Sequence, residues 1–386
     1  MALLPDTSMV PLILPSDKTL VRKAKNYKLN DIVVFKKDGR LIAHRIVFVY
    51  PDGSFQIKGD NNLTSDGRIS KSRMLGRVDK VLRGGQRLSL SHVYLSQSST
   101  YLQELNSLNK AMRKAKIAYV ILKGLPLHLA HGGRLPQRLY LDADILIKRK
   151  DYPRVEKIFL RAGFEPVRPK LLGRTVRSFS QISFVKKVKP FAVIFDLHFA
   201  PAVGFTKATG LNKLIPSLSR YTNGLFEAVK EVGVEGTLYP LLAGEDLVLY
   251  LLLHLSHRNY QGIHRMELID RLIRTTKPDM EIVVNKAKKY GFEYFIYPSL
   301  FTINKFFGAI TLPENLKIPY PVRLISKLVS NSSPFDEDRK AVEGAKRFVF
   351  AFFLSRASLT IKLSVLFSKD IPGYFFPTIK SAFFRT

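Results

Sequence analysis

The chain has 386 residues, of which 46% are hydrophobic, so it is long enough for two or three domains with sizeable cores. Its 62 Lys and Arg against 31 Asp and Glu give a formal charge of +31, spread along the sequence. This charge favours nucleic acid, nucleotides or an anionic membrane surface as partners, or it reflects only solvated basic faces. The absence of cysteine excludes disulfides, thiolate catalysis and Cys-ligated zinc.

The start of the chain, Met1 to Asp6, is too short and too acidic for a secretory signal. No run of about twenty apolar residues predicts a transmembrane segment. The most apolar tract, residues 347–366, is interrupted by polar residues and is typical of a buried or interfacial amphipathic helix. We therefore expect a cytoplasmic protein, with peripheral attachment to a membrane as the alternative.

The first ninety residues predict a small all-β barrel or sandwich. Short β-branched runs, separated by the turn signals Asp38-Gly39 and Asp52-Gly53, predict strands over 31–35, 42–49, 54–58 and 74–82. The string Arg83-Gly84-Gly85-Gln86 marks the natural boundary of this segment.

From about Leu88 the apolar residues recur at helical spacing, which predicts a long linking helix that reaches Met112. Strands are expected over 118–122 and 142–147, a helix over 152–162, and a hairpin formed by 182–188 and 191–197. Helices are expected over 245–257, 264–276, 280–290 and 341–366. These elements predict an α+β protein: an all-β domain over 1–90, a mixed sheet with helices over 91–240, and a mostly helical part over 241–386.

The β-rich segment contains the three residue types that nucleophilic acyl transfer needs. Ser8 begins the string Ser8-Met9-Val10-Pro11, His44 lies in a predicted strand, and Asp60 and Asp66 lie in or after Gly59-Asp60-Asn61-Asn62. A serine hydroxyl attacks when a base takes its proton, and a carboxylate holds a histidine base in the right tautomer. The structural alternative is that Ser8 and the two acids form turns and that His44 is a packed strand residue.

Together these strings resemble the signal peptidase I-like serine peptidases, over about residues 5–80, in the branch whose general base is histidine. The resemblance implies Ser8 as nucleophile, His44 as general base and Asp66 as the orienting acid, with Asp60 in a supporting role. It also implies a peptide substrate, or a related domain that only binds peptide.

A second group of acids lies outside that segment. Asp142 and Asp144 alternate along a predicted strand, so their side chains point to the same face. Two carboxylates so close favour a cation between them, and Mg²⁺ (or Mn²⁺) prefers oxygen ligands. Asp196 interrupts an apolar strand and is the best candidate for a third acid of a two-metal site.

The ordered set Leu122-Lys123-Gly124, Arg138, Asp142-Ala143-Asp144 and Asp196-Leu197-His198 resembles a poorly characterised nucleotidyltransferase family of the DNA polymerase beta-like superfamily. The resemblance covers about residues 100–380. It implies transfer of a nucleoside monophosphate from an NTP to a hydroxyl acceptor, with pyrophosphate leaving.

The resemblance also implies a role for each residue of the set. Asp142, Asp144 and Asp196 would bind Mg²⁺, Asp196 would also accept a proton, Lys123 and Gly124 would hold phosphates, and Arg138 would neutralise charge on the phosphoryl oxygens. Gly132-Gly133 is the rival phosphate loop. His198 is expected to be a supporting hydrogen-bond donor.

The sequence thus predicts a metal-dependent nucleotidyltransferase fused to a Ser/His/Asp peptidase-like domain. One alternative is a peptidase or peptide-binding protein in which the transferase-like part recognises only the target. The other is a catalytically inactive binding protein whose basic surface engages nucleic acid or a membrane.

Overall fold

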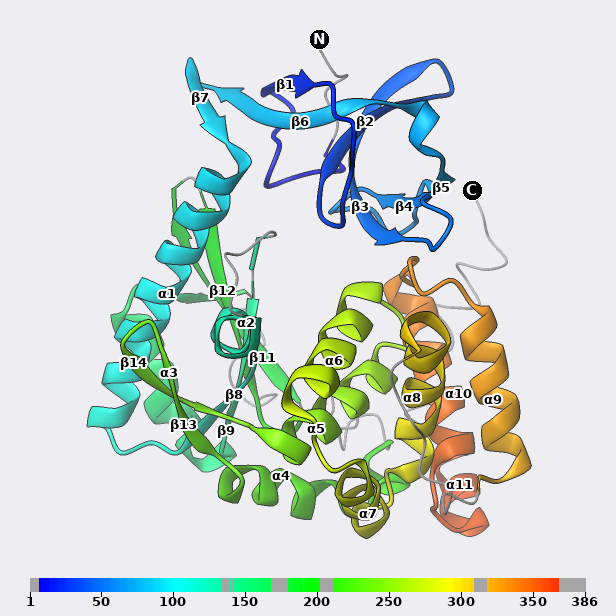
Figure 1. Cartoon of the computed structure of the whole chain (residues 1–386). Helices are drawn as coiled ribbons and strands as arrows, with labels where there is room; N and C mark the ends of the chain where they lie inside the picture. The colour runs from blue at the N-terminus through cyan, green and yellow to red at the C-terminus, as the bar shows by residue number, and fades with distance from the viewer. Residues whose placement is uncertain are drawn as a thin grey trace. The chain divides into compact units, whose positions relative to one another are not determined.

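The computed structural model describes residues 7–132, 139–140, 142–167, 180–189, 191–201, 211–308 and 318–367. The chain divides into two compact units. Figure 1 shows the chain coloured by residue number from the N-terminus to the C-terminus. The β unit comprises Met1–Leu102, Arg134–Tyr140 and Phe335–Glu337, and the mixed unit comprises the remaining residues. The long predicted helix is α1, Leu90–Lys114, which begins in the β unit and ends in the mixed unit. The α+β prediction is confirmed.

The β unit is one antiparallel sheet with the strand order β1-β6-β2-β3-β4-β5, and β7 pairs with β6. Its strands are β1 Lys18–Arg22, β2 Ile32–Lys37, β3 Arg40–Val49, β4 Phe55–Lys58, β5 Gly67–Ile69, β6 Met74–Arg83 and β7 Gln86–Ser89. Asp38 and Gly39 both have positive φ and form the two-residue turn between β2 and β3. This turn fixes the register that pairs Val33 with His44.

The mixed unit contains a seven-stranded sheet with the order β10-β11-β12-β9-β8-β14-β13. Its strands are β8 Tyr119–Lys123, β9 Asp142–Ile147, β10 Glu165–Pro166, β11 Gln181–Val188, β12 Phe191–His198, β13 Lys230–Val234 and β14 Thr237–Leu241. The helices among them are α2 Leu125–Gly132, α3 Tyr152–Arg161 and α4 Leu218–Glu227. The central strand β9 runs parallel to β12 and antiparallel to β8.

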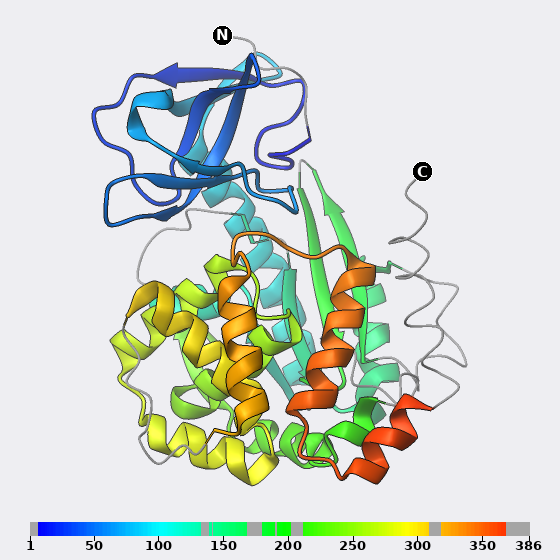
Figure 2. The same ribbon diagram turned by 90° about the vertical axis from the view of Figure 1, so that its right-hand side faces the viewer.

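The rest of the mixed unit is helical. Its helices are α5 Gly244–His257, α6 Ile263–Thr276, α7 Met280–Tyr290, α8 Glu293–Phe307, α9 Tyr320–Asn331, α10 Lys340–Leu354 and α11 Leu359–Leu366. Helix α5 is buried continuously from Leu247 to His257 and packs against α6, α7 and α8, so it forms the core of this part. Figure 2 shows α9 and α10 side by side on one face.

The prediction of one helix over 341–366 is wrong, because the chain leaves helical geometry between Leu354 and Leu359. The Ser355 hydroxyl donates to the carbonyl of Leu214 and accepts from the amide of Ala357. Ser358 then caps the next helix by accepting from the amide of Ile361. Serine side chains that bond to nearby backbone favour such breaks over a continuous helix.

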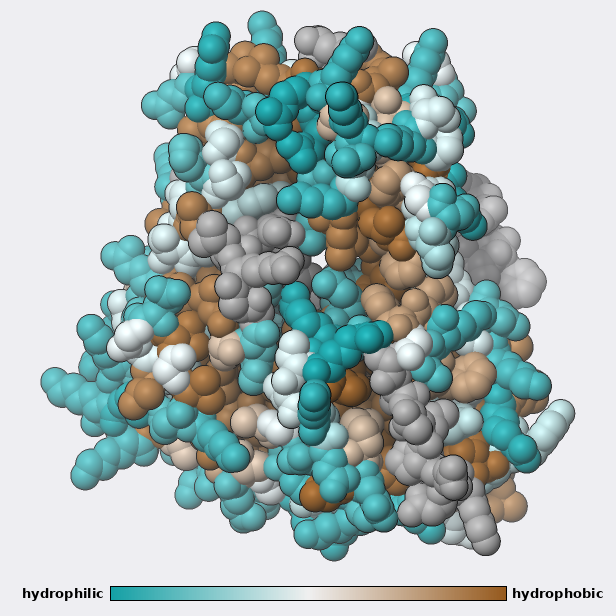
Figure 3. Space-filling view, viewed as in Figure 1, coloured by the Kyte–Doolittle hydropathy of each residue, from teal (hydrophilic) through white to brown (hydrophobic). Residues whose placement is uncertain are grey.

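The surface contains both polar and apolar areas. Figure 3 shows hydrophilic residues over most of the face in view, with smaller apolar areas between them. Within the part of the chain that the structure describes, no helix has both the length and the apolar character needed to cross a membrane.

Candidate active sites

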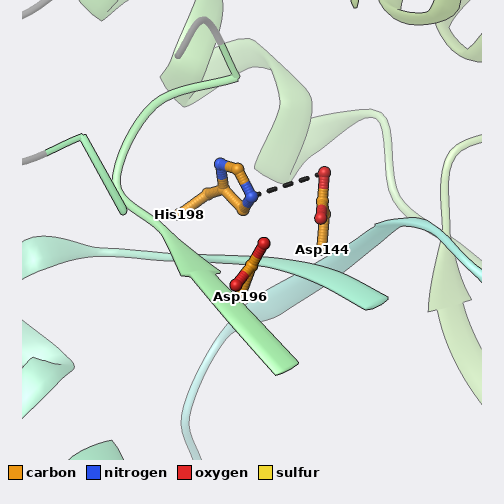
Figure 4. A group of neighbouring side chains, drawn as sticks. All are labelled: Asp144, Asp196 and His198. Carbon is orange, nitrogen blue, oxygen red and sulfur yellow. Dashed lines mark ion pairs between the residues drawn. The ribbon is translucent and has the colours of Figure 1, made fainter. Parts of the chain in front are cut away.

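Strands β9 and β12 bring two acids of the mixed unit together. The parallel register places Asp144 beside Asp196, and side chains at the same register of neighbouring strands lie on the same face. His198, two residues after Asp196, therefore lies on that face as well, as Figure 4 shows. Ligand atoms of Asp144, Asp196 and His198 all lie within 4.8 Å of one another.

Asp144 is the most buried acid of this group, with 3% of its surface exposed. Burial alone would raise the pKa of its carboxyl, but interactions with Lys123 and His198 outweigh burial and lower that pKa. The carboxylate is therefore ionised, and the ammonium of Lys123 lies close enough to compensate its buried negative charge.

Lys123 makes the largest single contribution to lowering this pKa. A bulge at Leu122 brings Lys123 into register with Asp144, and its Nζ lies 3.3 Å from Oδ2 of both Asp142 and Asp144. Burial opposes the charged lysine, yet the two carboxylates raise its pKa. The sequence predicted a phosphate contact for this lysine, whereas it here bridges the acids.

The two remaining acids differ in environment. The side chain of Asp142 is 50% exposed at the beginning of β9. Asp196 is half-buried, and burial together with the charge of Asp144 raises its pKa, although Ser183 opposes the shift with a hydrogen bond. Its Oδ1 is buried and has no hydrogen-bond partner among the described residues. A buried carboxylate oxygen without a partner fits the donor set of a divalent cation.

Two of the other predicted residues, Gly124 and Gly132, lie in the segment after β8. Gly124, with φ of +119°, forms the turn into α2, at a backbone conformation that glycine adopts readily. Gly132, of the rival pair, is the last residue of that helix. Gly133 and Arg138 lie outside the described residues.

Further positive charge comes from the end of α5 and the start of α6. Arg258 and Arg265 both act electrostatically on Lys123 and on the buried His254. The intervening turn has positive φ at Asn259, Tyr260 and Gly262, a conformation that is strained for the two residues with side chains. The side-chain amide of Asn259 donates to the carboxylate of Asp338 and to the backbone carbonyl of Glu343, and these two hydrogen bonds hold the turn. The helical part thus adds two arginines to the electrostatic surroundings of the acids.

The β unit contains a separate constellation. The Oγ of Ser8 lies 2.8 Å from Nε2 of His44, and the Nδ1 of His44 lies 2.5 Å from Oδ2 of Asp66. When the Nδ1–H of His44 donates a hydrogen bond to Asp66, Nε2 is unprotonated and can accept the proton of the serine hydroxyl. Ser8 and His44 are both buried.

The loop Gly59-Asp60-Asn61 explains why these residues meet. The amide of Asn61 donates to the carbonyl of Ser8 at 2.7 Å, which fixes the serine backbone. A Cβ on Gly59 would lie only 2.9 Å from Nε2 of His44, so this position needs glycine. Asp60 accepts two hydrogen bonds from the buried guanidinium of Arg45, at 2.6 Å each. Its supporting role in a peptidase-like site stays a prediction.

Lys37 is a residue of this constellation that the sequence analysis did not single out. Its Nζ donates to Oδ1 of Asp66 at 3.1 Å, while Oδ2 faces His44. Burial would raise the pKa of Asp66, but its hydrogen bonds and charge interactions with His44 and Lys37 lower it. A signal was present in the sequence, because Lys37 directly precedes the Asp38-Gly39 turn that sets the register of His44.

A family model of uncharacterised nucleotidyltransferases matches residues 88–308, more than half of the chain. This match assigns the mixed unit to the nucleotidyltransferases as a class. The chain belongs to the uncharacterised nucleotidyltransferase family. No curated protein and no solved structure matches the chain. The matched range begins after Ser8, His44 and Asp66, so the resemblance of the β unit to signal peptidase I-like peptidases is not supported by these comparisons and stays a prediction.

Proposed function

We propose that the mixed unit is a metal-dependent nucleotidyltransferase that transfers a nucleoside monophosphate from an NTP to a hydroxyl acceptor. The observation that carries this proposal is the pairing of Asp144 and Asp196 at one register of parallel strands, with a buried carboxylate oxygen of Asp196 left without a described partner. Family membership supports nucleotidyl transfer as the reaction class.

The acids and the cations around them would divide the work. Asp144 and Asp196 would hold Mg²⁺ or Mn²⁺, with Asp142 beside them. When bound, the cation neutralises charge on the phosphates and polarises the phosphoryl group. Asp196 would also accept the proton of the attacking hydroxyl.

Lys123 would exchange its partners when the nucleotide binds. Its ammonium now compensates Asp142 and Asp144, a task that a divalent cation would take over. The lysine can then turn to a phosphate oxygen, with the amide of Gly124 at the N-terminus of α2 as a second donor. Arg258 and Arg265 would add positive charge to the same triphosphate, and Arg138 keeps the role that the sequence predicted.

Binding of Mg²⁺ and NTP to the full chain tests the proposal. We expect the thermal unfolding midpoint to rise with NTP only when Mg²⁺ is present, and this rise to vanish in Asp144→Asn. Glu227→Gln, which removes the same charge from an exposed position on α4, is the matched control and should respond like the natural chain. An Mg²⁺-independent shift, or an unchanged shift in Asp144→Asn, would contradict the proposal.

A second candidate function belongs to the β unit. We propose that Ser8, His44 and Asp66 form a serine hydrolase site for peptides, because the two contacts of His44 have the order and distances that such a relay requires. A fluorophosphonate probe should label Ser8, and the label should be absent in Ser8→Ala and His44→Ala. Ser72→Ala, at an exposed position of the same unit, should keep the label. Labelling that survives in Ser8→Ala would refute this assignment.

A further inference from the structure

The feature that carries a further inference is the buried imidazole of His198. The residue is 2% exposed at the end of β12. Neither of its ring nitrogens has a hydrogen-bond partner in the described part of the chain. Burial of a polar group without such a partner is unfavourable, so a buried imidazole of this kind needs an explanation.

The direction of the ring supplies one. In Figure 4 the imidazole of His198 is turned toward Asp144, and Asp196 lies beside both. The Nε2 of His198 lies 3.3 Å from Oδ2 of Asp144, which is within ion-pair range but lacks the alignment of a hydrogen bond. The buried Oδ1 of Asp196 and the ring nitrogens of His198 thus lie close to Asp144 without a hydrogen bond of standard geometry.

A direct contact with Asp144 would be an alternative explanation for the position of the ring. Lys123 already contributes a positive charge at 3.3 Å from the same carboxylate. A hydrogen bond from the imidazole N–H to this carboxylate would also be expected to be short and well aligned. The observed arrangement is more typical of three ligands around a common point.

We propose that Nε2 of His198 is a direct ligand of the divalent cation held by Asp144 and Asp196. This inference rests on the proposed metal dependence and replaces the supporting role that the sequence predicted for His198. A site with two carboxylate ligands and one imidazole ligand differs from an all-oxygen site, because imidazole suits transition metals better than Mg²⁺. The site should therefore prefer Mn²⁺ to Mg²⁺.

Mn²⁺ bound to the full chain tests this inference directly. Electron spin echo spectroscopy of the complex should show modulation from a directly coordinated ¹⁴N nucleus, and ¹⁵N-labelled histidine should replace that signal with the ¹⁵N pattern. In His198→Asn the modulation should be absent and the affinity for Mn²⁺ should fall at least about tenfold relative to that for Mg²⁺. His92→Asn, at an exposed position, is the matched control and should keep both properties.

His254→Asn provides an independent assignment, because His254 also interacts electrostatically with Asp144. Modulation that persists in this variant supports His198 even if His198→Asn does not fold. Modulation that disappears in His254→Asn would overturn the inference. Stoichiometric Mn²⁺ binding without any ¹⁴N modulation would also overturn it and leave the proposed function intact. Failure of the natural chain to bind Mn²⁺ would refute both proposals.

Discussion

The two constellations of this chain differ in how completely their side chains satisfy one another. In the β unit, Ser8, His44 and Asp66 form a closed series of contacts, with Lys37 occupying the second oxygen of Asp66. In the mixed unit, Asp196 and His198 leave buried polar atoms without hydrogen-bond partners among the described residues. The first arrangement fits the proposed proton transfer without a further partner, whereas the second fits the proposed binding of a metal ion. We therefore expect the site of the mixed unit, and not that of the β unit, to respond to a metal ion.

The largest expected effect concerns the closed series. Asp66→Asn keeps the shape of the side chain but removes the charge that fixes the tautomer of His44, so the rate of fluorophosphonate labelling should fall about 10⁴-fold. Mg²⁺ should change the labelling rate of neither the natural chain nor Asp66→Asn. The rates are measured by quantifying labelled protein over time. A variant that labels as fast as the natural chain would show that the series is only structural.

Nucleotidyl transfer should distinguish the acids of the mixed unit. Asp196→Asn removes a ligand and a proton acceptor, so the transfer rate should fall about 10²- to 10³-fold. Asp142→Asn should have a smaller effect, because Asp142 is half-exposed and lies outside the donor group. Release of pyrophosphate from labelled NTP gives both rates. An equal loss of transfer rate in Asp196→Asn and Asp142→Asn would contradict the different roles proposed for the two acids.

Lys123→Met tests whether the lysine stands in for a metal ion. Removal of one member of a buried ion pair leaves Asp144 with less compensation, so the free energy of unfolding should fall by about 3 kcal/mol. Mn²⁺ should restore more stability to this variant than to the natural chain, as measured by denaturant titration. Lys186→Met, which breaks the 2.8 Å pair with Glu104, is the control. Its stability should not respond to Mn²⁺ in this way.

Gly59→Ala is expected to have the smallest effect. The added methyl group would lie 2.9 Å from Nε2 of His44 and 2.8 Å from the side-chain amide of Asn62. The resulting displacement should destabilise the β unit by about 1–3 kcal/mol and slow the labelling of Ser8. Gly53→Ala, where the structure has open space, should leave the labelling rate unchanged although its positive φ also costs stability. Equal labelling of Gly59→Ala and the natural chain would contradict the close approach.

The sequence predicted the general fold because its signals are local. The alternation of Asp142 and Asp144 and the Asp38-Gly39 turn each depend on a few neighbouring residues, and the structure has the expected strands around them. The break before Leu359 was missed because apolar residues continue on both sides of it. Ser358, a residue type favoured at helix N-termini, was the available signal.

The metal site of the mixed unit could be predicted only in part, because its contacts depend on residues far apart in the sequence. The sequence offered Asp196 as the best candidate for a third acid, but the register that pairs it with Asp144 is a long-range property of the sheet. The contacts of Lys123 with both carboxylates depend on a bulge at Leu122, which no local sequence pattern predicted. The same holds for the ring of His198, whose unbonded nitrogens become visible only when all its neighbours are placed.

The most direct test is a crystal structure of the full chain with Mn²⁺ and a non-hydrolysable NTP analogue, with anomalous scattering used to locate the metal. The account predicts an anomalous peak in contact with Asp144 and Asp196, with the triphosphate beside it and Lys123 turned toward a phosphate. A nucleotide bound elsewhere, or carboxylates that remain bridged by Lys123 with no metal between them, would contradict it.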